Sequence, residues 1–362
     1  MSPTAYLSRR SRTSAVTALA CLAFAAACTQ GVVGQPGTHA NRTTPPSTSH
    51  TYLGIRVEPV APTHAHALDP PVAGFLAAST APDRIWIGSA HGLAWLDPDD
   101  GTTHLVDGKP GVGLAVAGHE LYRAAWAGND VSRYDISDGQ AREVARAPAP
   151  SPLYIAVSAG GLWAADHDHG RLLRLDPRTL RITKRVTIGS GAGLGTAGMV
   201  WLGGHLWVVS KRDKSLYEVD GRTGRPVSRV DLGGPVGDDI TLTHAGIWAE
   251  VDVNSDDHPV YCLVDPRRHQ VVAHVNVREA ANITKDTAWM IAAPIVVGEQ
   301  LWIAVDRYLV RLDPDGGWKP DRVLELPTPI TARFALSAFG SVWIYSAHPE
   351  PSVIRVDGAA LA

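Results

Sequence analysis

Four groups of charged and polar residues interrupt a chain otherwise rich in apolar residues and glycine, and they are its candidates for chemistry. The groups are Asp166-His167-Asp168-His169, Lys211-Arg212-Asp213-Lys214, the stretch from Asp252 to His258, and the set Asp238, Asp239, Asp286 and Arg333. The first group offers two imidazoles and two carboxylates, which are ligand types of divalent metals. Because neighbouring residues rarely all face one ion, a solvated polar loop is the alternative interpretation.

The stretch from Asp252 to His258 places oxygen ligands at alternate positions, as a calcium-binding loop does. It lacks the central glycine of such a loop, and its twelfth position is Leu263, where a bidentate Glu is needed. A solvated loop explains this composition as well, so we assign no metal and no cofactor. The sequence also has no Walker loop, no nucleophile elbow and no zinc cysteine pair, and no catalytic residue is assigned.

Internal repeats indicate which elements carry these groups. A glycine-containing turn, an aliphatic residue and Trp recur in five units, and Ile85-Trp86 and Leu121-Tyr122 fill the same place in the first two; a strand ending in Asp follows each of the seven rings after 11 to 17 residues. The ring positions, here called slot residues, are Trp86, Tyr122, Trp163, Trp207, Trp248, Trp302 and Trp343. The strand-ending residues are Asp97, Asp135, Asp176, Asp220, Asp265, Asp313 and Asp357. Asp accepts hydrogen bonds from its own turn, so each unit predicts a tight turn after its third strand.

Each unit reads as four short strands, which in the third unit are expected at 153–158, 162–166, 171–175 and 182–188. The 292 residues from Pro71 to Ala362 give about 42 per unit, the size of one blade of a β-propeller. The sequence therefore predicts an all-β, seven-bladed propeller with four antiparallel strands per blade. The last unit lacks a fourth strand after Asp357, so we expect Tyr52 to Val57 to supply it and close the ring.

Repeated residues are expected to serve the fold. One ring per unit at one strand position indicates core packing between blades, with a ladder of carbohydrate-stacking rings as the alternative. The rings outside this register, Trp126, Trp201 and Trp289, are better candidates for a ligand surface, although core packing is expected first for them too. An Arg precedes the turn Asp by two positions in four units, at Arg133, Arg174, Arg311 and Arg355. We expect these arginines to cover the blade face and bond turn acceptors rather than to form a ring of cations.

The recurring pattern Gly-x-Leu-Trp-Val followed by Leu-x-Arg-Leu-Asp-Pro-x-Thr-Gly resembles bacterial propellers of the YVTN, NHL and streptogramin-lyase class. The resemblance covers about four-fifths of the chain and implies the fold, not the function. Streptogramin lyases carry Glu three positions after the slot, whereas this chain has Ser89, Ala125, Asp166, Ser210, Val251, Val305 and Ser346 there. Asp220-Gly221-Arg222-Thr223-Gly224-Arg225 begins like a quinone-dependent propeller repeat, but Ser228 occupies the place of its Trp.

The N-terminus has the features of an export signal. Arg9, Arg10 and Arg12 precede a run of apolar residues from Ala15 to Ala27, which is shorter than the roughly 20 residues of a membrane span. Ala25-Ala26-Ala27-Cys28 resembles the lipobox of bacterial lipoproteins, in which the Cys becomes lipidated at the new N-terminus. Simple cleavage after an Ala-x-Ala site is the alternative. Ser8-Arg9-Arg10 partly resembles a twin-arginine signal, but we favour the general export route.

These features divide the chain into a signal peptide at 1–27, a flexible linker at 28–50 and a propeller at 51–362. The linker is rich in Thr, Pro and Ser and too poor in apolar residues to fold. With Cys21 removed and Cys28 lipidated, only Cys262 remains, so we expect no disulfide and a buried Cys262. The net charge is −3, and removal of residues 1–27 takes away three Arg and no acid, leaving −6. This balance predicts no nucleic-acid binding.

In such a propeller, the loops between second and third strands share one face with the loops that join the blades. We call this face the mouth. The predicted binding residues at the mouth are Asp166, His167, Asp168, His169, Lys211, Arg212, Asp238, Asp239, Asp286, Trp289 and Arg333. We expect a monomeric lipoprotein on the outer face of the cytoplasmic membrane that binds a protein or a small polar ligand. A lyase or hydrolase with its site at the mouth is the alternative, and a convergent His–carboxylate pair beneath a pocket would favour it.

Overall fold

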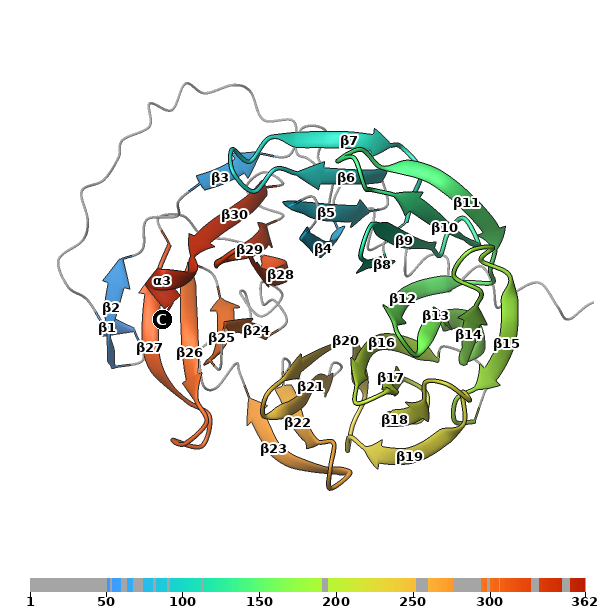
Figure 1. Ribbon diagram of the computed structural model, residues 1–362. Helices are drawn as coiled ribbons and strands as arrows, with labels where there is room; N and C mark the ends of the chain where they lie inside the picture. The colour runs from blue at the N-terminus through green and yellow to red at the C-terminus, as the bar shows by residue number, and fades with distance from the viewer. Residues whose placement is uncertain are drawn as a thin grey trace, which may run out of the picture. The chain divides into compact units, whose positions relative to one another are not determined.

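Strand-forming segments separated by glycine- and aspartate-containing turns build seven sheets around a central opening (Figure 1). The computed structural model describes residues 51–52, 54–59, 64–67, 74–80, 83–89, 92–111, 113–190, 195–251, 260–276, 294–297, 300–305, 307–326, 332–346 and 352–361. The signal peptide, Cys28, the linker, the stretch 252–258, Asp286 and Trp289 lie outside these residues. Within the described part of the chain, no helix has the length and apolar character needed to cross a membrane.

The first four blades each contain four antiparallel strands that follow one another in the chain. Blade 1 is β4 (Gly74–Thr80), β5 (Asp83–Ser89), β6 (Gly92–Leu96) and β7 (Thr103–Asp107). Blade 2 is β8 (Gly113–Ala117), β9 (Glu120–Ala125), β10 (Asp130–Asp135) and β11 (Arg142–Pro148). Blade 3 is β12 (Pro152–Ser158), β13 (Gly161–Asp166), β14 (Arg171–Leu175) and β15 (Ile182–Thr187), with the short 3₁₀ turn η1 (His167–His169) between β13 and β14. Blade 4 is β16 (Thr196–Leu202), β17 (His205–Ser210), β18 (Ser215–Asp220) and β19 (Pro226–Asp231).

The remaining blades complete the ring, and two of them include strands from the start of the described chain. Blade 5 is β20 (Val236–Thr243), β21 (Gly246–Val251), β22 (Val260–Asp265) and β23 (Gln270–Asn276). Blade 6 is β24 (Ile295–Val297), β25 (Gln300–Val305), β26 (Tyr308–Asp313) and β27 (Lys319–Glu325), extended by β1 (Thr51–Tyr52) and β2 (Ile55–Pro59). Blade 7 is β28 (Ala332–Ala338), β29 (Ser341–Ser346), β30 (Ser352–Asp357) and β3 (His64–Ala67), and helix α3 (Gly358–Leu361) follows β30. The predicted seven-bladed all-β fold is confirmed.

An N-terminal strand closes the last blade, as predicted, but it is not the predicted segment. The strand β3 pairs antiparallel with β30, with Ala65 opposite Ile354. The prediction that Tyr52 to Val57 fills this place is therefore wrong. The physical reason is the connection to blade 1: six residues separate Ala67 from Gly74, whereas sixteen would separate Val57 from Gly74, and neighbouring sheets are joined by short loops.

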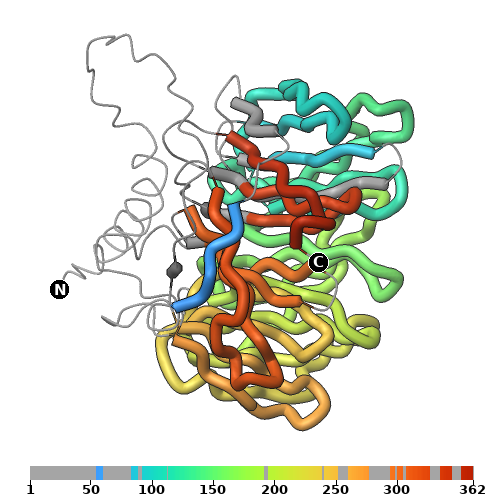
Figure 2. The backbone as a smooth tube through the Cα atoms, turned by 90° about the vertical axis from the view of Figure 1, so that its left-hand side faces the viewer, coloured from blue at the N-terminus to red at the C-terminus, as the bar shows by residue number. Residues whose placement is uncertain are grey.

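The segment that was expected to close the ring instead widens blade 6. Strand β2 pairs parallel with β27, with Val57 opposite Val323, and β1 folds back on β2 through a turn at Gly54. Val57 is buried among the apolar residues of blades 5 and 6. Figure 2 shows β2 running along the outside of β27. Burial of Val57 and a parallel ladder thus attach this segment one blade earlier in the ring than the closing strand.

The slot residues form the core between blades, which confirms their expected role. All seven rings are at most 1% exposed. The ring nitrogen of Trp163 donates to the carbonyl oxygen of Gly221 in the next blade at 3.3 Å. Each slot ring therefore contributes a large apolar area to a seam, and the Trp163 indole also bonds the next blade, whereas the Trp248 ring nitrogen has no acceptor among the described residues.

Two of the four repeated arginines, Arg174 and Arg355, cover a slot ring and bond a turn of the next blade, as expected, whereas Arg133 and Arg311 pair with Glu120 and Asp321 of their own blades. The guanidinium of Arg174 lies 5.9 Å from the centre of the Trp163 ring, and Nη1 donates to the carbonyl oxygen of Arg222 in blade 4 at 2.7 Å. The guanidinium of Arg355 lies 5.2 Å from the Trp343 ring and donates to Pro98 in blade 1 at 2.7 Å. Cation–π contact plus a bond to the next turn makes this Arg a device of the fold.

Candidate functional site

The mouth consists of two kinds of loop, which the strand order brings to one face: the loops between the second and third strands of each blade, here called 2–3 loops, and the loops that join one blade to the next. A chain of backbone hydrogen bonds joins these loops around blades 3 and 4. The His167 N–H donates to Ser151 at 3.0 Å, the Gly195 N–H donates to His167 at 2.9 Å, and the Lys211 N–H donates to Gly195 at 2.8 Å. Each bond links segments from different loops, so the rim of the mouth is preorganised between Ser151 and Lys211.

Asp166 is the anchor of the first predicted group and is completely buried. Arg171 donates to its Oδ2 from Nε at 2.9 Å and from Nη2 at 2.6 Å, while Nδ1 of His169 lies 2.6 Å from Oδ1. Both oxygens of the Asp166 carboxylate are therefore bonded to side chains at the other end of the same loop. Its position at the end of β13 explains why the loop needs these partners, because an unpaired buried carboxylate would be costly.

The other members of this group divide between the interior and the surface. His167 is buried, and its Nδ1 lies 3.0 Å from the carbonyl oxygen of Thr196 in blade 4. Asp168 accepts from the Ser151 hydroxyl at 2.7 Å and from the Trp126 ring nitrogen at 3.3 Å. His169 is half-exposed. Among the four predicted residues, His169 is thus the one that the loop presents most openly to solvent.

The second group combines one tethered acid with exposed cations. Asp213 accepts from the Ser190 hydroxyl at 2.8 Å, from Ser210 at 3.1 Å and from Tyr217 at 3.2 Å. Burial raises the pKa of Asp213, but the hydrogen bonds, led by those from Ser190, outweigh it, so the pKa lies below its usual value. This carboxylate fastens the loop after β15 to the 2–3 loop of blade 4.

The cations beside Asp213 have different degrees of freedom. Lys211 donates to Asp238 at 3.0 Å, which connects the 2–3 loop of blade 4 to the innermost strand of blade 5. Arg212 and Lys214 are exposed. The mouth therefore presents the imidazole of His169 and the charges of Arg212 and Lys214 outward, while its described acids accept hydrogen bonds from neighbouring groups.

Three predicted residues lie in strands rather than in the expected loops. Asp238 and Asp239 belong to β20, and Arg333 belongs to β28, so these residues of the predicted mouth lie in strands and not in the loops of which the mouth was expected to consist. Both strands carry a register shift near their start, between Val236 and Ile240 in β20 and just after Ala332 in β28. A register shift of this kind is a β-bulge, in which one strand contains an extra residue, so residues near the blade entry can still belong to the strand.

The structure offers no support for a metal among the residues it describes, because no three His, Cys, Asp or Glu side chains gather there as ligands. One nitrogen of each histidine in the first group is engaged, that of His167 by Thr196 and that of His169 by Asp166. The calcium-type stretch 252–258 lies outside the described residues. Asp166, His167 and Asp168 thus make hydrogen bonds that hold the mouth loops together.

Sequence reasoning missed the most unusual residue of the mouth side, Arg123 in β9. Its side chain is completely buried, and Nη1 donates to Asp107 at 2.8 Å and to the Lys109 carbonyl oxygen at 3.0 Å. Its Nε and Nη2 have no acceptor among the described residues. The signal was available, because the position after the slot is apolar in the six other units: Ile87, Ala164, Val208, Ala249, Ile303 and Ile344.

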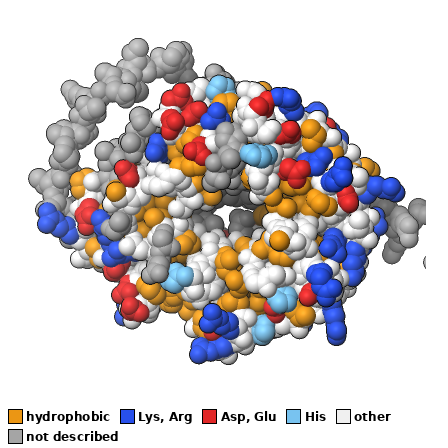
Figure 3. Space-filling view, viewed as in Figure 1, with side chains coloured by type: hydrophobic (Ala, Val, Ile, Leu, Met, Phe, Trp, Pro, Cys, Tyr) orange, Lys and Arg blue, Asp and Glu red, His pale blue; other side chains and the backbone are white. Residues whose placement is uncertain are grey.

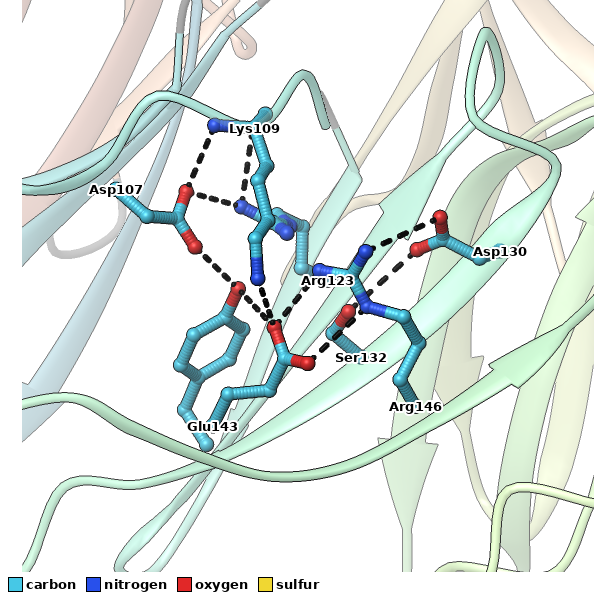
Figure 4. A network of polar contacts seen from close by, with 8 residues as sticks. Asp107, Lys109, Arg123, Asp130, Ser132, Glu143 and Arg146 are labelled. Carbon is cyan, nitrogen blue, oxygen red and sulfur yellow. Dashed lines mark hydrogen bonds and ion pairs between the residues drawn. The ribbon is translucent and has the colours of Figure 1, made fainter.

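Arg123 belongs to a polar network between blades 1 and 2 (Figure 4). Tyr134 donates to Asp107 at 2.8 Å, and Glu143 accepts from Lys109 at 3.0 Å and from Arg146 at 2.7 Å. Burial raises the pKa of Tyr134 well above its usual value, so the phenol remains a donor. Burial also raises the pKa of Asp107, but bonds from Tyr134 and Arg123 outweigh it and the pKa lies below its usual value. The seam is therefore held by ionised side chains and a neutral phenol that bond one another.

One small cavity lies on the opposite face, in the seam between blades 5 and 6. Its volume is about 10 Å³, enough for one water-sized molecule. Trp248 and Trp318 line it, with ring centres 4.8 Å apart in an edge-on arrangement. This cavity does not adjoin the His–carboxylate pair of blade 3.

No protein-family model matches the chain, and no curated protein matches it in sequence. Solved propellers match it in fold. The structure of virginiamycin B lyase from Staphylococcus aureus aligns with a TM-score of 0.61 at 13% identity, over 81% of this chain and 98% of that chain. BamB from Moraxella catarrhalis aligns with a TM-score of 0.52 at 12% identity, over 82% of this chain and 99% of that chain.

A third match is the β-propeller domain of Cps50 (Swd1) from Myceliophteria thermophila, with a TM-score of 0.61 at 14% identity over 82% of this chain and 99% of that chain. At identities this low, the likeness shows the propeller fold alone. The same architecture appears in virginiamycin B lyase, in BamB and in Cps50 (Swd1), so the fold does not decide between an enzyme and a binding module.

Proposed function

We propose that this protein is an exported, lipid-anchored propeller that binds a protein or a small polar ligand at its mouth. The observation that carries the proposal is the backbone chain from Ser151 through His167 and Gly195 to Lys211, which fixes the rim before any ligand arrives. A preformed rim lowers the entropic cost of binding. Residues that break the repeat, His169, Arg212 and Lys214, lie on this rim.

The anchor and the location rest on the sequence. The basic start, the run of apolar residues and Ala25-Ala26-Ala27-Cys28 support lipidation of Cys28 and residence on the outer face of the cytoplasmic membrane. A linker of about 22 residues has a root-mean-square reach of roughly 25 Å. That reach would let the propeller meet partners near the membrane surface.

The test is chemical cross-linking in native membranes, followed by mass spectrometry of what the protein captures. Two double variants are compared with the wild type: H169A/R212A at the mouth, and H244A/R267A, which removes the same residue types from exposed turns of blade 5 on the opposite face. We expect a reproducible partner to be lost in H169A/R212A and kept in H244A/R267A. The mouth assignment is wrong if the opposite pattern appears.

A second candidate function is lyase or hydrolase chemistry at the mouth, and the His169–Asp166 pair favours it. A carboxylate 2.6 Å from Nδ1 favours the tautomer protonated there, which leaves the Nε2 lone pair for a substrate proton. The measurement is a screen of ester and lactone substrates with the wild type and H169A. Turnover by the wild type that H169A lowers at least 100-fold would establish catalysis, and equal rates would exclude His169 as the base.

A further inference from the structure

Blades 3 and 4 concentrate positive charge in a chain that is acidic as a whole. Between Pro152 and Asp231 the sequence has twelve Lys and Arg but seven Asp and Glu, a surplus of five positive charges, whereas the full chain carries −3. The four residues of this region outside the described part, 191–194, carry no charge. The excess therefore belongs to described strands and turns.

The surface is more one-sided than the total charge. In blades 3 and 4 nine cationic side chains are exposed and Asp231 is the single exposed acid, whereas the other described residues expose seven cations and nine acids. The nine, here called the basic sector, are Arg178, Arg181, Lys184, Arg185, Arg212, Lys214, Arg222, Arg225 and Arg229. Figure 3 shows Lys and Arg side chains gathered at the lower right, over the outer strands of these blades.

The basic sector continues from one face of the ring to the other. Arg229 on β19 donates from Nη2 to the carbonyl oxygen of Asp213 at 3.2 Å, which joins the outer wall to the mouth loop. Lys184 on β15 donates to the carbonyl oxygen of Thr223, which joins the outer wall of blade 3 to the opposite-face turn of blade 4. Sector cations therefore lie on the mouth loop, on the outer strands and on the opposite-face turns of blades 3 and 4.

Most acids of these blades are less exposed than the cations and accept hydrogen bonds, and Asp231 is the exception that is exposed. Asp166 is buried beneath Arg171, and Asp213 accepts bonds from Ser190, Ser210 and Tyr217. Asp176 and Asp220 accept hydrogen bonds inside their own turns. These acids reduce the field of the sector, but exposed cations outnumber exposed acids nine to one in these blades, which favours a positive field there.

We propose that the basic sector docks an extended acidic polypeptide segment of a partner protein. Seven of its nine cations are Arg, whose planar fork bonds carboxylates through two N–H groups. A flexible acidic chain can follow a surface that curves from mouth to opposite face. A flat bilayer would meet only the outer wall at Lys184, Arg185 and Arg229.

The experiment measures binding of a fluorescein-labelled decaglutamate peptide to the full-length protein in detergent by fluorescence anisotropy. We expect binding at 50 mM salt that weakens at least threefold at 300 mM, because exposed charges are screened within a few ångströms at higher ionic strength. R185E/R225E, two exposed sector positions, should weaken binding at least tenfold. R56E/K319E reverses two exposed cations in blade 6 and makes the same change in net charge.

The control decides between a local surface and overall charge. Equal loss in R185E/R225E and R56E/K319E, or no binding of the peptide by the wild type at 50 mM salt, would overturn the proposal. Vesicles containing one-third anionic lipid form a second arm, and sector-dependent binding to vesicles but not to peptide would assign the surface to membranes instead. R185E/R225E leaves His169, Arg212 and Lys214 of the mouth unchanged, so a loss of peptide binding in this variant is not a loss of the mouth residues.

Discussion

At the scale of single residues, the most informative positions are those where one blade departs from the other six. Arg123 takes the place of an apolar residue and brings a charge into the seam between blades 1 and 2. Asp107 and Tyr134 surround it, and the ring of Tyr134 lies 5.2 Å from the guanidinium. A fully buried charge depends on such partners, because removal of one leaves the others uncompensated.

Replacement of Arg123 by Met should therefore destabilise the fold by about 3 kcal/mol, because Asp107 loses its buried partner. Arg142→Met, in the same blade, removes an exposed pair with Asp138 and should cost less than about 0.5 kcal/mol. Urea denaturation monitored by tryptophan fluorescence measures both. Equal midpoints for the two variants would show that the Arg123 network contributes no more than a surface pair.

Asp213 gives a prediction for pH. Its pKa in the fold lies below the value of about 3.9 in an unfolded chain. The carboxylate therefore stabilises the fold above that pH, and this contribution disappears as the pH falls through the folded pKa. The stability difference between wild type and Asp213→Asn, less than about 1 kcal/mol for this partly exposed group, should be largest at pH 6 to 7. It should shrink toward pH 3 in urea titrations, and a constant difference across that range would contradict the assignment.

At the scale of elements, the two N-terminal strands have different tasks. Strand β3 closes blade 7 against β30, and β2 with β1 adds to blade 6 against β27. The chain thus crosses two neighbouring blades before it begins blade 1. A pull on the N-terminus meets the parallel β2–β27 ladder before it reaches the closing strand, so β2 protects the ring closure.

Deletions can separate the two tasks. Removal of 51–67 takes away β1, β2 and β3 and should lower the melting temperature by at least about 5 °C, while removal of 51–59 spares β3 and should lower it by roughly half as much. Deletion of 40–48 in the predicted linker is the length control, and we expect no change for it. Calorimetry measures all three. If deletion of 51–59 lowers the melting temperature as much as deletion of 51–67, then β3 contributes nothing beyond β1 and β2, and its assigned role in ring closure is wrong.

At the scale of the whole molecule, charge and attachment determine how the protein meets its surroundings. Five surplus positive charges lie in blades 3 and 4, and the balance of the chain is acidic. The N-terminal strands join the ring at blades 6 and 7. The predicted tether therefore joins the ring at blades 6 and 7, whereas the basic sector lies on blades 3 and 4. A propeller held by this tether would leave the sector accessible to a partner.

The tether itself is testable. Cys28→Ala should move most of the protein from the membrane fraction to the medium, because a lipid chain at Cys28 is the predicted anchor. Immunoblots of the two fractions measure the shift, and Cys262→Ala is the control that removes a buried cysteine of blade 5. A Cys28→Ala protein that stays with the membrane would refute the lipobox assignment.

The sequence by itself determined the fold, because a slot ring and a turn aspartate recur in every unit. A large ring at a strand position is stable only when it is buried, and an Asp after a strand accepts hydrogen bonds from its own turn. A ring at Trp163 must be buried, and Asp176 must accept the N–H groups of its own turn, as the structure shows. Both roles depend on local geometry and burial, which spacing reveals. The same spacing predicted the strands of blade 3 almost to the residue.

Only the tertiary structure decided which N-terminal strand closes the ring, which mouth residues are exposed, and where the cations gather. Val57 and Ala65 both lie in strand-forming segments, and the choice between them depends on loop lengths and on the burial of Val57 in blade 6. Asp166 and His169 are both polar members of one four-residue group, yet the Asp166 side chain is buried and the His169 side chain is half-exposed. Such differences arise from contacts between residues far apart in the chain, as between Lys184 and Thr223, and a pattern with a local period does not contain them.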